Sequence, residues 1–151
     1  SSNNYLYGNY INCGNADCIT LGVNVTLDCQ GNSITSIYNV SGIYAAARNI
    51  TIRNCNITMG VVGTNNTNTM GIEMTDGADY SSIINNTISG GGMRYGLRFY
   101  DTAFNGADNC LIENNVIDVS NTSYGLGSYS YQAYNNRFIL FCIGDIVKGC
   151  I

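Results

Sequence analysis

The chain has 151 residues, of which 45% are hydrophobic and 11% are charged, and its formal net charge is −4. So high a hydrophobic fraction argues against a disordered chain, and the few basic residues give no patch for nucleic acid. We expect no membrane span, because no apolar run is long enough. The polar start at Ser1 has no signal-peptide pattern, so a secreted protein would have this chain as its mature form.

Two short motifs alternate along the chain. The first is an alternating apolar run with an Asn-rich corner, and its copies are Val25–Ile34, Asn49–Thr58, Ser82–Ile88, Leu111–Ile117 and Gln132–Phe138. The second is Gly followed by an apolar residue, at Gly42, Gly71, Gly96 and Gly125. Copies recur about every 21 to 31 residues, a period typical of solenoids. Because no helix-length periodic run separates them, we predict an all-β fold, a parallel β-helix of about five coils.

The whole chain, 1–151, is predicted to form one domain. Residues 1–18 are polar and Tyr-rich and form an N-terminal cap or arm, 19–138 form the coils, and 139–151 form an apolar C-terminal tail. The expected coils are Ile19–Ile37, Gly42–Met59, Gly71–Ser89, Gly96–Val119 and a last one from Gly125. A polar loop, Val61–Thr69, separates the second coil from the third.

Stacked coils should place equivalent side chains in columns. One predicted inward column contains Leu27, Ile52, Ile83, Ile112 and Ala133, and another contains Ile43, Ile72, Leu97 and Leu126. A corner ladder of asparagines is predicted at Asn54, Asn85, Asn114 and Asn135. Asn tolerates the left-handed backbone of a sharp corner, and its amide can bond to the next coil. The alternative is that these residues are ordinary turn formers.

The run from Cys18 to Ile34, followed by Asn49–Ile57, resembles the repeats of NosD-like and pectin-lyase-like proteins. The similarity covers roughly Cys18 to Phe138 and implies a single-stranded right-handed parallel β-helix, a fold frequent in secreted archaeal and bacterial proteins. That family includes polysaccharide lyases, hydrolases, carbohydrate-binding surface proteins and structural fibres. The resemblance therefore implies a fold and does not choose a function.

Seven cysteines without any histidine favour a disulfide framework over a zinc site, and hence an extracellular protein. The candidate pairs are Cys13 with Cys18, Cys29 with Cys55, and Cys142 with Cys150. Cys29 and Cys55 fall near the same corner of neighbouring coils, at a spacing that suits a disulfide. Cys110 is then either a buried thiol or an intermolecular partner. The alternative is that all seven are reduced core residues.

Seven Asn-x-Ser/Thr sequons also favour secretion. The candidate glycosylation sites are Asn24, Asn39, Asn49, Asn56, Asn65 and Asn121. Asn85 is the seventh sequon, but it falls in the predicted corner ladder. Asn39, Asn65 and Asn121 are the best candidates, because they lie in predicted connecting loops.

The ionisable residues do not favour catalysis. The chain has ten carboxylates, scattered mostly over loops, and no histidine. The residues that carry chemistry in polysaccharide lyases have no matching positions here, and we predict no catalytic residue, no metal site and no cofactor. Two outward pairs on adjacent coils, Asp28 with Arg53 and Glu73 with Arg98, are explained as cross-strand ion pairs.

Tyrosines are expected to gather on one side of the later coils. They are Tyr44, Tyr95, Tyr100, Tyr124, Tyr129, Tyr131 and Tyr134. Aromatic faces stack on sugar rings, so this side could bind carbohydrate. Packing under glycans and a subunit contact are the alternatives.

The ends of the coil stack suggest self-association. A β-helix exposes strand edges at each end, and no amphipathic helix is predicted to cover them. Head-to-tail contact between copies would then build a ring or a filament, unless the apolar tail folds back over its own core. We therefore expect a non-catalytic extracellular structural protein, a self-assembling glycosylated subunit of a cell-surface filament or layer. The alternative is a secreted carbohydrate-binding or carbohydrate-active module.

Overall fold

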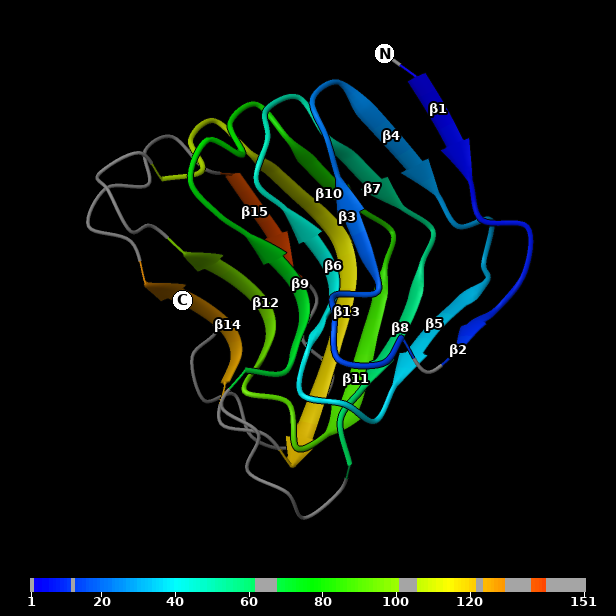
Figure 1. The fold of residues 1–151 in the computed structure, drawn as a ribbon. Coiled ribbons are helices and arrows are strands. Elements are labelled where there is room, and N and C mark those ends of the chain that lie inside the picture. Colours follow the sequence, from blue (N-terminus) through cyan, green and yellow to red (C-terminus); the bar gives the residue numbers. More distant parts are fainter. Residues whose placement is uncertain are drawn as a thin grey trace.

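The computed structural model describes residues 2–11, 13–61, 68–100, 106–121, 124–129 and 137–140. In these ranges the chain forms β-strands and no helix, and every strand pairing is parallel. The strands stack as a β-solenoid of about four turns, as Figure 1 shows. The all-β parallel β-helix predicted from the repeats is therefore confirmed, with slightly fewer turns than the five expected.

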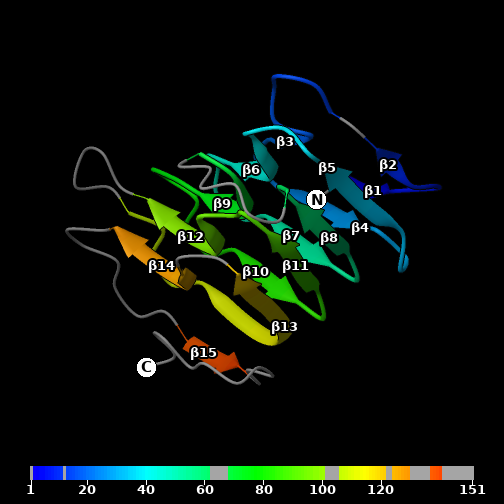
Figure 2. The same ribbon diagram turned by 90° about the horizontal axis from the view of Figure 1, so that it is seen from below.

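Each turn of the chain crosses three faces, which Figure 2 shows from below. The first face contains β1 (Ser2–Tyr5), β4 (Val25–Asp28), β7 (Thr51–Arg53), β10 (Ser82–Ile84), the start of β13 (Leu111–Asn121) and β15 (Arg137–Leu140). The second contains β2 (Tyr10–Ile11), β5 (Ser33–Ser36), β8 (Asn56–Met59), β11 (Thr87–Gly91) and the end of β13. The third contains β3 (Ile19–Leu21), β6 (Ser41–Ala45), β9 (Met70–Met74), β12 (Tyr95–Tyr100) and β14 (Tyr124–Tyr129). Because β13 runs around a corner, it joins the first two faces into one sheet.

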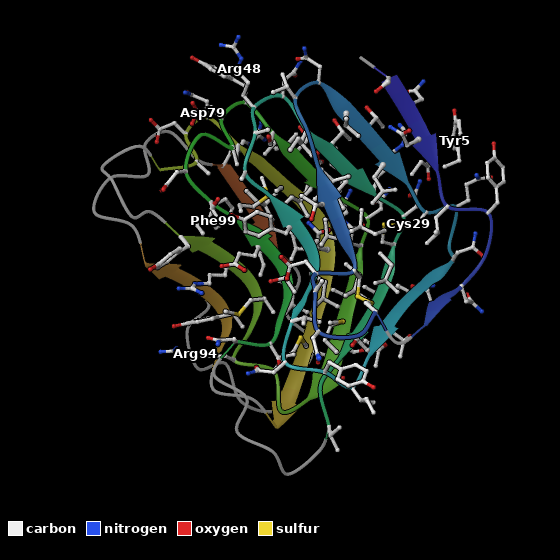
Figure 3. All side chains as sticks on the ribbon, in the orientation of Figure 1. Tyr5, Cys29, Arg48, Asp79, Arg94 and Phe99 are labelled. Carbon is white, nitrogen blue, oxygen red and sulfur yellow. A yellow bond between two sulfur atoms is a disulfide. The ribbon has the colours of Figure 1, made fainter. Side chains whose placement is uncertain are left out.

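The core consists of aliphatic columns, one along the inner side of each face. The first face stacks Leu27, Ile52, Ile83 and Ile112, and the third stacks Ile19, Ile43, Ile72 and Leu97, whose register partner on β14 is Leu126. The second face adds Ile34, Ile57, Ile88 and Ile117. Ile52, Ile72 and Ile83 have no exposed surface, and Phe99 of β12, labelled in Figure 3, is 2% exposed. Period-two alternation along each strand therefore builds one narrow apolar interior.

The last predicted member of the first column is wrong. Phe138 of β15, and not Ala133, is the register partner of Ile112. The motif copy at Gln132–Phe138 resembles the earlier copies in its asparagines, yet the strand begins only at Arg137. On the first face, the strand next to β13 is β15, which comes later in the chain than the repeat predicted. Ala133 itself lies outside the described residues.

The N-terminal segment expected as a cap or arm contributes two strands to the stack. β1 pairs with β4, and β2 pairs with β5, both in parallel register. All four residues of β1 are exposed, including Asn4, which is the register partner of the buried Leu27. The first inward column thus ends in a polar side chain.

Close approach of successive coils explains why glycine recurs in the second motif. A Cβ added at Gly42 would lie 2.7 Å from Gly71 O, and one added at Gly71 would overlap Gly96 O and Ile88 Cγ2. At each of these two glycines the added Cβ meets a backbone oxygen, which cannot rotate away as a side chain can. The column of glycines is therefore required by the distance between coils, not by a turn.

We predict that Gly71→Ala lowers the free energy of unfolding by about 1–3 kcal/mol, because the added methyl forces backbone apart in a packed interior. Gly22→Ala is the matched control, since its added Cβ meets nothing within 4 Å. Urea unfolding of both variants checks this, and an equal effect of the two substitutions would count against steric exclusion at Gly71.

Candidate functional site

The predicted asparagine corner adopts the expected backbone. Asn54, Asn85 and Asn114 have φ of 57°, 55° and 55°. Their predecessors Arg53, Ile84 and Glu113 are register partners, so the asparagines fall one above another at the corner between the first and second faces. Asn135 lies outside the described residues.

A second left-handed corner was not predicted as a ladder. Asn24, Asn49, Tyr80 and Asn109, with φ between 53° and 60°, lead into the strands of the first face. The backbone N–H of Asn24 donates to Arg48 O, and that of Asn49 donates to Asp79 O. Asn24 and Asn49 stood out in the sequence as sequons, and Tyr80 hides the pattern because tyrosine seldom adopts this conformation.

The inner side of the asparagine corner holds a buried amide ladder. Asn86 and Asn115 are each 1% exposed. Asn86 Oδ1 accepts from Cys55 N–H at 3.0 Å while its Nδ2 donates to Ile52 O at 3.0 Å. Asn115 repeats this one coil on, accepting from Asn86 N–H at 2.9 Å and donating to Ile83 O at 2.7 Å. Each amide satisfies two backbone groups that the corner leaves unpaired, which explains why Asn occurs here in doublets.

On the preceding coils the same column holds a disulfide. Cys29 and Cys55 are fully buried and linked, with a Cα–Cα distance of 4.8 Å, the spacing of neighbouring strands. Cys13 and Cys18 form the other disulfide of the described residues. Two of the three pairs proposed from the sequence are thus present, and the third, Cys142 with Cys150, lies outside the described residues.

Cys110 is a buried thiol, 2% exposed, that is not part of a disulfide. Its Sγ lies 3.3 Å from Ala78 O. Burial raises the pKa of this thiol from 9.0 to about 11. A thiol that is both buried and protonated is unreactive, so the structure favours the buried thiol over the intermolecular partner.

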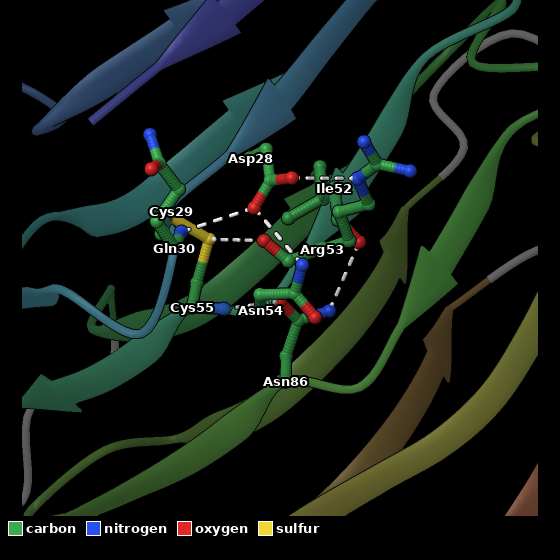
Figure 4. A network of polar contacts seen from close by, with 8 residues as sticks. All are labelled: Asp28, Cys29, Gln30, Ile52, Arg53, Asn54, Cys55 and Asn86. Atoms are coloured by element: carbon green, nitrogen blue, oxygen red, sulfur yellow. Dashed lines mark hydrogen bonds and ion pairs between the residues drawn. A yellow bond between two sulfur atoms is a disulfide. The ribbon is translucent and has the colours of Figure 1, made fainter. Parts of the chain in front are cut away.

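Asp28 organises the outer side of the corner, as Figure 4 shows. It accepts from Asn54 Nδ2 at 2.9 Å, from Gln30 N–H at 3.0 Å and from Arg53 Nε at 3.0 Å. The hydrogen bond from Asn54, helped by those of Gln30 and Arg53, holds the pKa of Asp28 below 3.8 despite its desolvation. The predicted ion pair with Arg53 is present, and the carboxylate also holds the turn.

A groove of about 480 Å³ lies on the outer side of the third face. The polar side chains that matter most in its lining are Asp17, Thr20, Asn39, Ser41, Glu73 and Arg98. Ser41 connects two carboxylates, because its N–H donates to Asp17 Oδ1 at 2.9 Å and its Oγ donates to Glu73 Oε2 at 2.7 Å. Met70, 2% exposed, adds an apolar wall.

Arg98 supplies the positive charge of the groove. Its Nη1 donates to Glu73 Oε1 at 3.2 Å, which is the second predicted ion pair, and both side chains are about seven-eighths buried, at 14% and 13% exposed. The guanidinium lies over the ring of Tyr100, 3.9 Å from its centroid, and 5.5 Å from that of Tyr95. Its Nε is buried and has no partner in the described structure.

Sugar binding is one of the roles predicted for the tyrosines, and it needs open ring faces. Tyr95 and Tyr100 instead cover Arg98, and Tyr95 is only 7% exposed. Tyr124 and Tyr129 are their register partners on β14, which places four of the seven predicted tyrosines on the third face. Tyr44 is there too, its Oη 3.4 Å from Thr75 Oγ1. Tyr131 and Tyr134 lie outside the described residues.

The described sequons differ in what the side-chain amide does. Asn49 Nδ2 donates to Asn24 Oδ1 at 2.8 Å, and Asn56 Nδ2 donates to Gly31 O at 2.6 Å. Asn39 uses only its oxygen, which accepts from Asn68 N–H and Thr69 Oγ1, both at 3.0 Å. Asn121 ends β13, and Asn65 lies outside the described residues. No cluster of three or more metal-ligating side chains occurs among the described residues.

Comparison with family models, curated proteins and solved structures found no match to this chain. The resemblance to NosD-like and pectin-lyase-like repeats therefore extends to the parallel β-solenoid and no further.

We predict that removing the buried disulfide with Cys29→Ala/Cys55→Ala lowers the free energy of unfolding by about 3.5 kcal/mol, from the chain entropy of the loop it closes. The two cysteines are 26 residues apart in sequence, against 5 for Cys13 and Cys18. Cys13→Ala/Cys18→Ala should therefore cost only about 2 kcal/mol. Denaturant unfolding without reductant measures both, and a larger loss for the N-terminal pair would contradict this assignment.

Acid should weaken the corner through Asp28. Because its folded-state pKa lies below the unfolded value of 3.8, its stabilisation is complete above 3.8 and is lost as pH falls through the folded value. Asp28→Asn should thus be less stable than the parent chain at pH 7, with the difference shrinking as pH drops below 3.8. Unfolding midpoints of both chains across this pH range measure the difference. A difference that does not change with pH would contradict a stabilising role for the Asp28 charge.

Proposed function

We propose that this protein is a non-catalytic extracellular structural solenoid that assembles head-to-tail with further copies. The observation that carries the proposal is the open edge of β1. It pairs with β4 on one side, and no described strand pairs with its other side.

The hydrogen bonds of β1 show which groups are free at this edge. Ser2 N–H donates to Asn24 O and Leu6 N–H donates to Asp28 O, both at 3.1 Å. In a parallel ladder alternate residues direct both backbone groups to the same neighbour, so Asn3 and Tyr5 direct theirs away from β4. These groups form a template for one more parallel strand.

Nothing in the sequence of this edge protects it. Natural sheets discourage edge pairing with charges, proline or a bulge. Residues 2–11 contain no charged residue and no proline, and β1 keeps an unbroken register with β4. Polar side chains such as Asn3 and Asn4 can instead continue as ladders onto an added strand.

The opposite end of the stack offers matching partners. The first face begins with β1 and ends with β15, and the third begins with β3 and ends with β14. A second copy placed in register would continue each face, a heterologous contact that extends into a filament. The two disulfides fit an oxidising, extracellular setting, in which such a filament would serve as a surface layer or fibre. No helix in the described part of the chain is long and apolar enough to cross a membrane.

Asn3→Pro tests the assembly. Proline removes the N–H that points to the open edge and leaves the Ser2 and Leu6 bonds to β4 in place. We expect the parent chain to form fibres visible by negative-stain electron microscopy, and the variant to remain monomeric with an unchanged circular dichroism spectrum.

Asn3→Ala is the matched control, because it alters the side chain and keeps the backbone donor. It should assemble as the parent chain does. A parent chain that stays monomeric up to its solubility limit, or fibres that persist with proline at position 3, would contradict the proposal.

A further inference from the structure

We propose that the groove on the third face is the binding site of a glycan attached to the protein's own Asn39. The inference rests on the proposed extracellular location, since N-glycosylation occurs in that export route. It names a specific occupant for the groove: the sugar residues nearest the attachment point.

The sequon forms part of the groove wall. Asn39, Val40 and Ser41 all line the groove. Asn39 is exposed, whereas Val40 and Ser41 are buried at 7% and 3% exposure. The acceptor asparagine is thus followed at once by two buried residues that also line the groove.

The side-chain amide of Asn39 is held ready for substitution. Its Oδ1 accepts from Asn68 N–H and Thr69 Oγ1, which fixes the plane of the amide. Its Nδ2, the atom that a glycan modifies, makes no hydrogen bond to a described residue. Glycosylation therefore keeps both existing bonds. At Asn49 and Asn56, in contrast, the same nitrogen already holds the coil through a hydrogen bond.

The groove has the chemistry of a saccharide site. Its volume of about 480 Å³ falls within the range of small-ligand sites. Asp17 Oδ2 makes no hydrogen bond to a described residue and can accept from a sugar hydroxyl. The ion pair of Glu73 and Arg98 and the exposed Thr20 also line the groove and add polar groups that a sugar can contact.

The attachment itself needs a donor that the cell supplies, an oligosaccharide linked through its anomeric carbon to a lipid phosphate. The bond between Asn39 Nδ2 and the anomeric carbon forms as the bond from that carbon to the phosphate oxygen breaks. The lipid phosphate leaves with the electron pair, and one amide proton passes to a base of the transferase. No oxidation or reduction occurs, and the product is a secondary amide.

The experiment expresses the full chain in a eukaryotic secretory host and measures glycan occupancy and glycan release. Mass spectrometry of glycopeptides should find Asn39 occupied, and Asn39→Gln should remove that glycan alone. A glycosidase that cleaves within the glycan core should act about tenfold slower at Asn39 in the folded protein than in the unfolded protein. Glu73→Gln removes the carboxylate that pairs with Arg98 and accepts from Ser41 in the groove lining, so it should restore most of the rate while Asn39 stays occupied.

Asn24→Gln is the matched control, because Asn24 is an exposed sequon outside the groove lining, and it should change neither occupancy nor release at Asn39. An unoccupied Asn39 in a chain whose Asn24 is occupied would overturn the proposal. Equal rates of glycan release from folded and unfolded protein would also overturn it. So would an added oligosaccharide that binds the groove equally well with and without the Asn39 glycan, because an occupied groove should exclude it. These readouts concern single chains, so their failure leaves the assembly proposal intact.

Discussion

The structure depends on one constraint: equivalent residues of successive coils lie opposite one another at the spacing of paired strands. Each position must therefore tolerate a copy of itself about 4.8 Å away. Aliphatic side chains satisfy this inside, and glycine satisfies it where the backbone itself comes too close. Like charges do not, because repulsion at this distance is unfavourable. The low charge content follows, and the two outward ion pairs, Asp28 with Arg53 and Glu73 with Arg98, join opposite charges on adjacent coils.

The corner between the first and second faces shows how one column changes chemistry without changing shape. Its inner positions hold Cys29 and Cys55 in the early coils and Asn86 and Asn115 in the later ones. The disulfide ties two coils covalently, and the amides tie the next coils through paired backbone bonds. Only the amides replace backbone hydrogen bonds that the left-handed corner leaves unmade. Asp28 adds a third tie on the outer side, where its carboxylate gathers three donors.

The sequence predicted what repeats and missed what occurs once. Period-two alternation and the Gly-apolar motif predicted the columns that contain Ile52 and Ile72, because the same two motifs recur in successive coils. The last coil was misplaced, since the asparagines before Arg137 imitate the motif while the strand that carries Phe138 follows them. The groove could not be foreseen either. Asp17 and Asn39 come from connecting segments, whereas Glu73 and Arg98 come from strands of different coils. These residues become neighbours only when the coils stack, so their spacing in the sequence gives no sign of the groove.

The most direct test of register stacking is a cross-link between predicted partners. Thr51 and Ser82 are opposite each other on β7 and β10, both on the outer side. Thr51→Cys/Ser82→Cys should form a disulfide in the folded chain, found by mass spectrometry of non-reduced peptides, because opposed Cα atoms lie within disulfide range. Thr51→Cys/Ile84→Cys, displaced by two residues, should not form one. Efficient bonding in the displaced pair and none in the opposed pair would contradict the solenoid register, and with it the account of core, corners and edges.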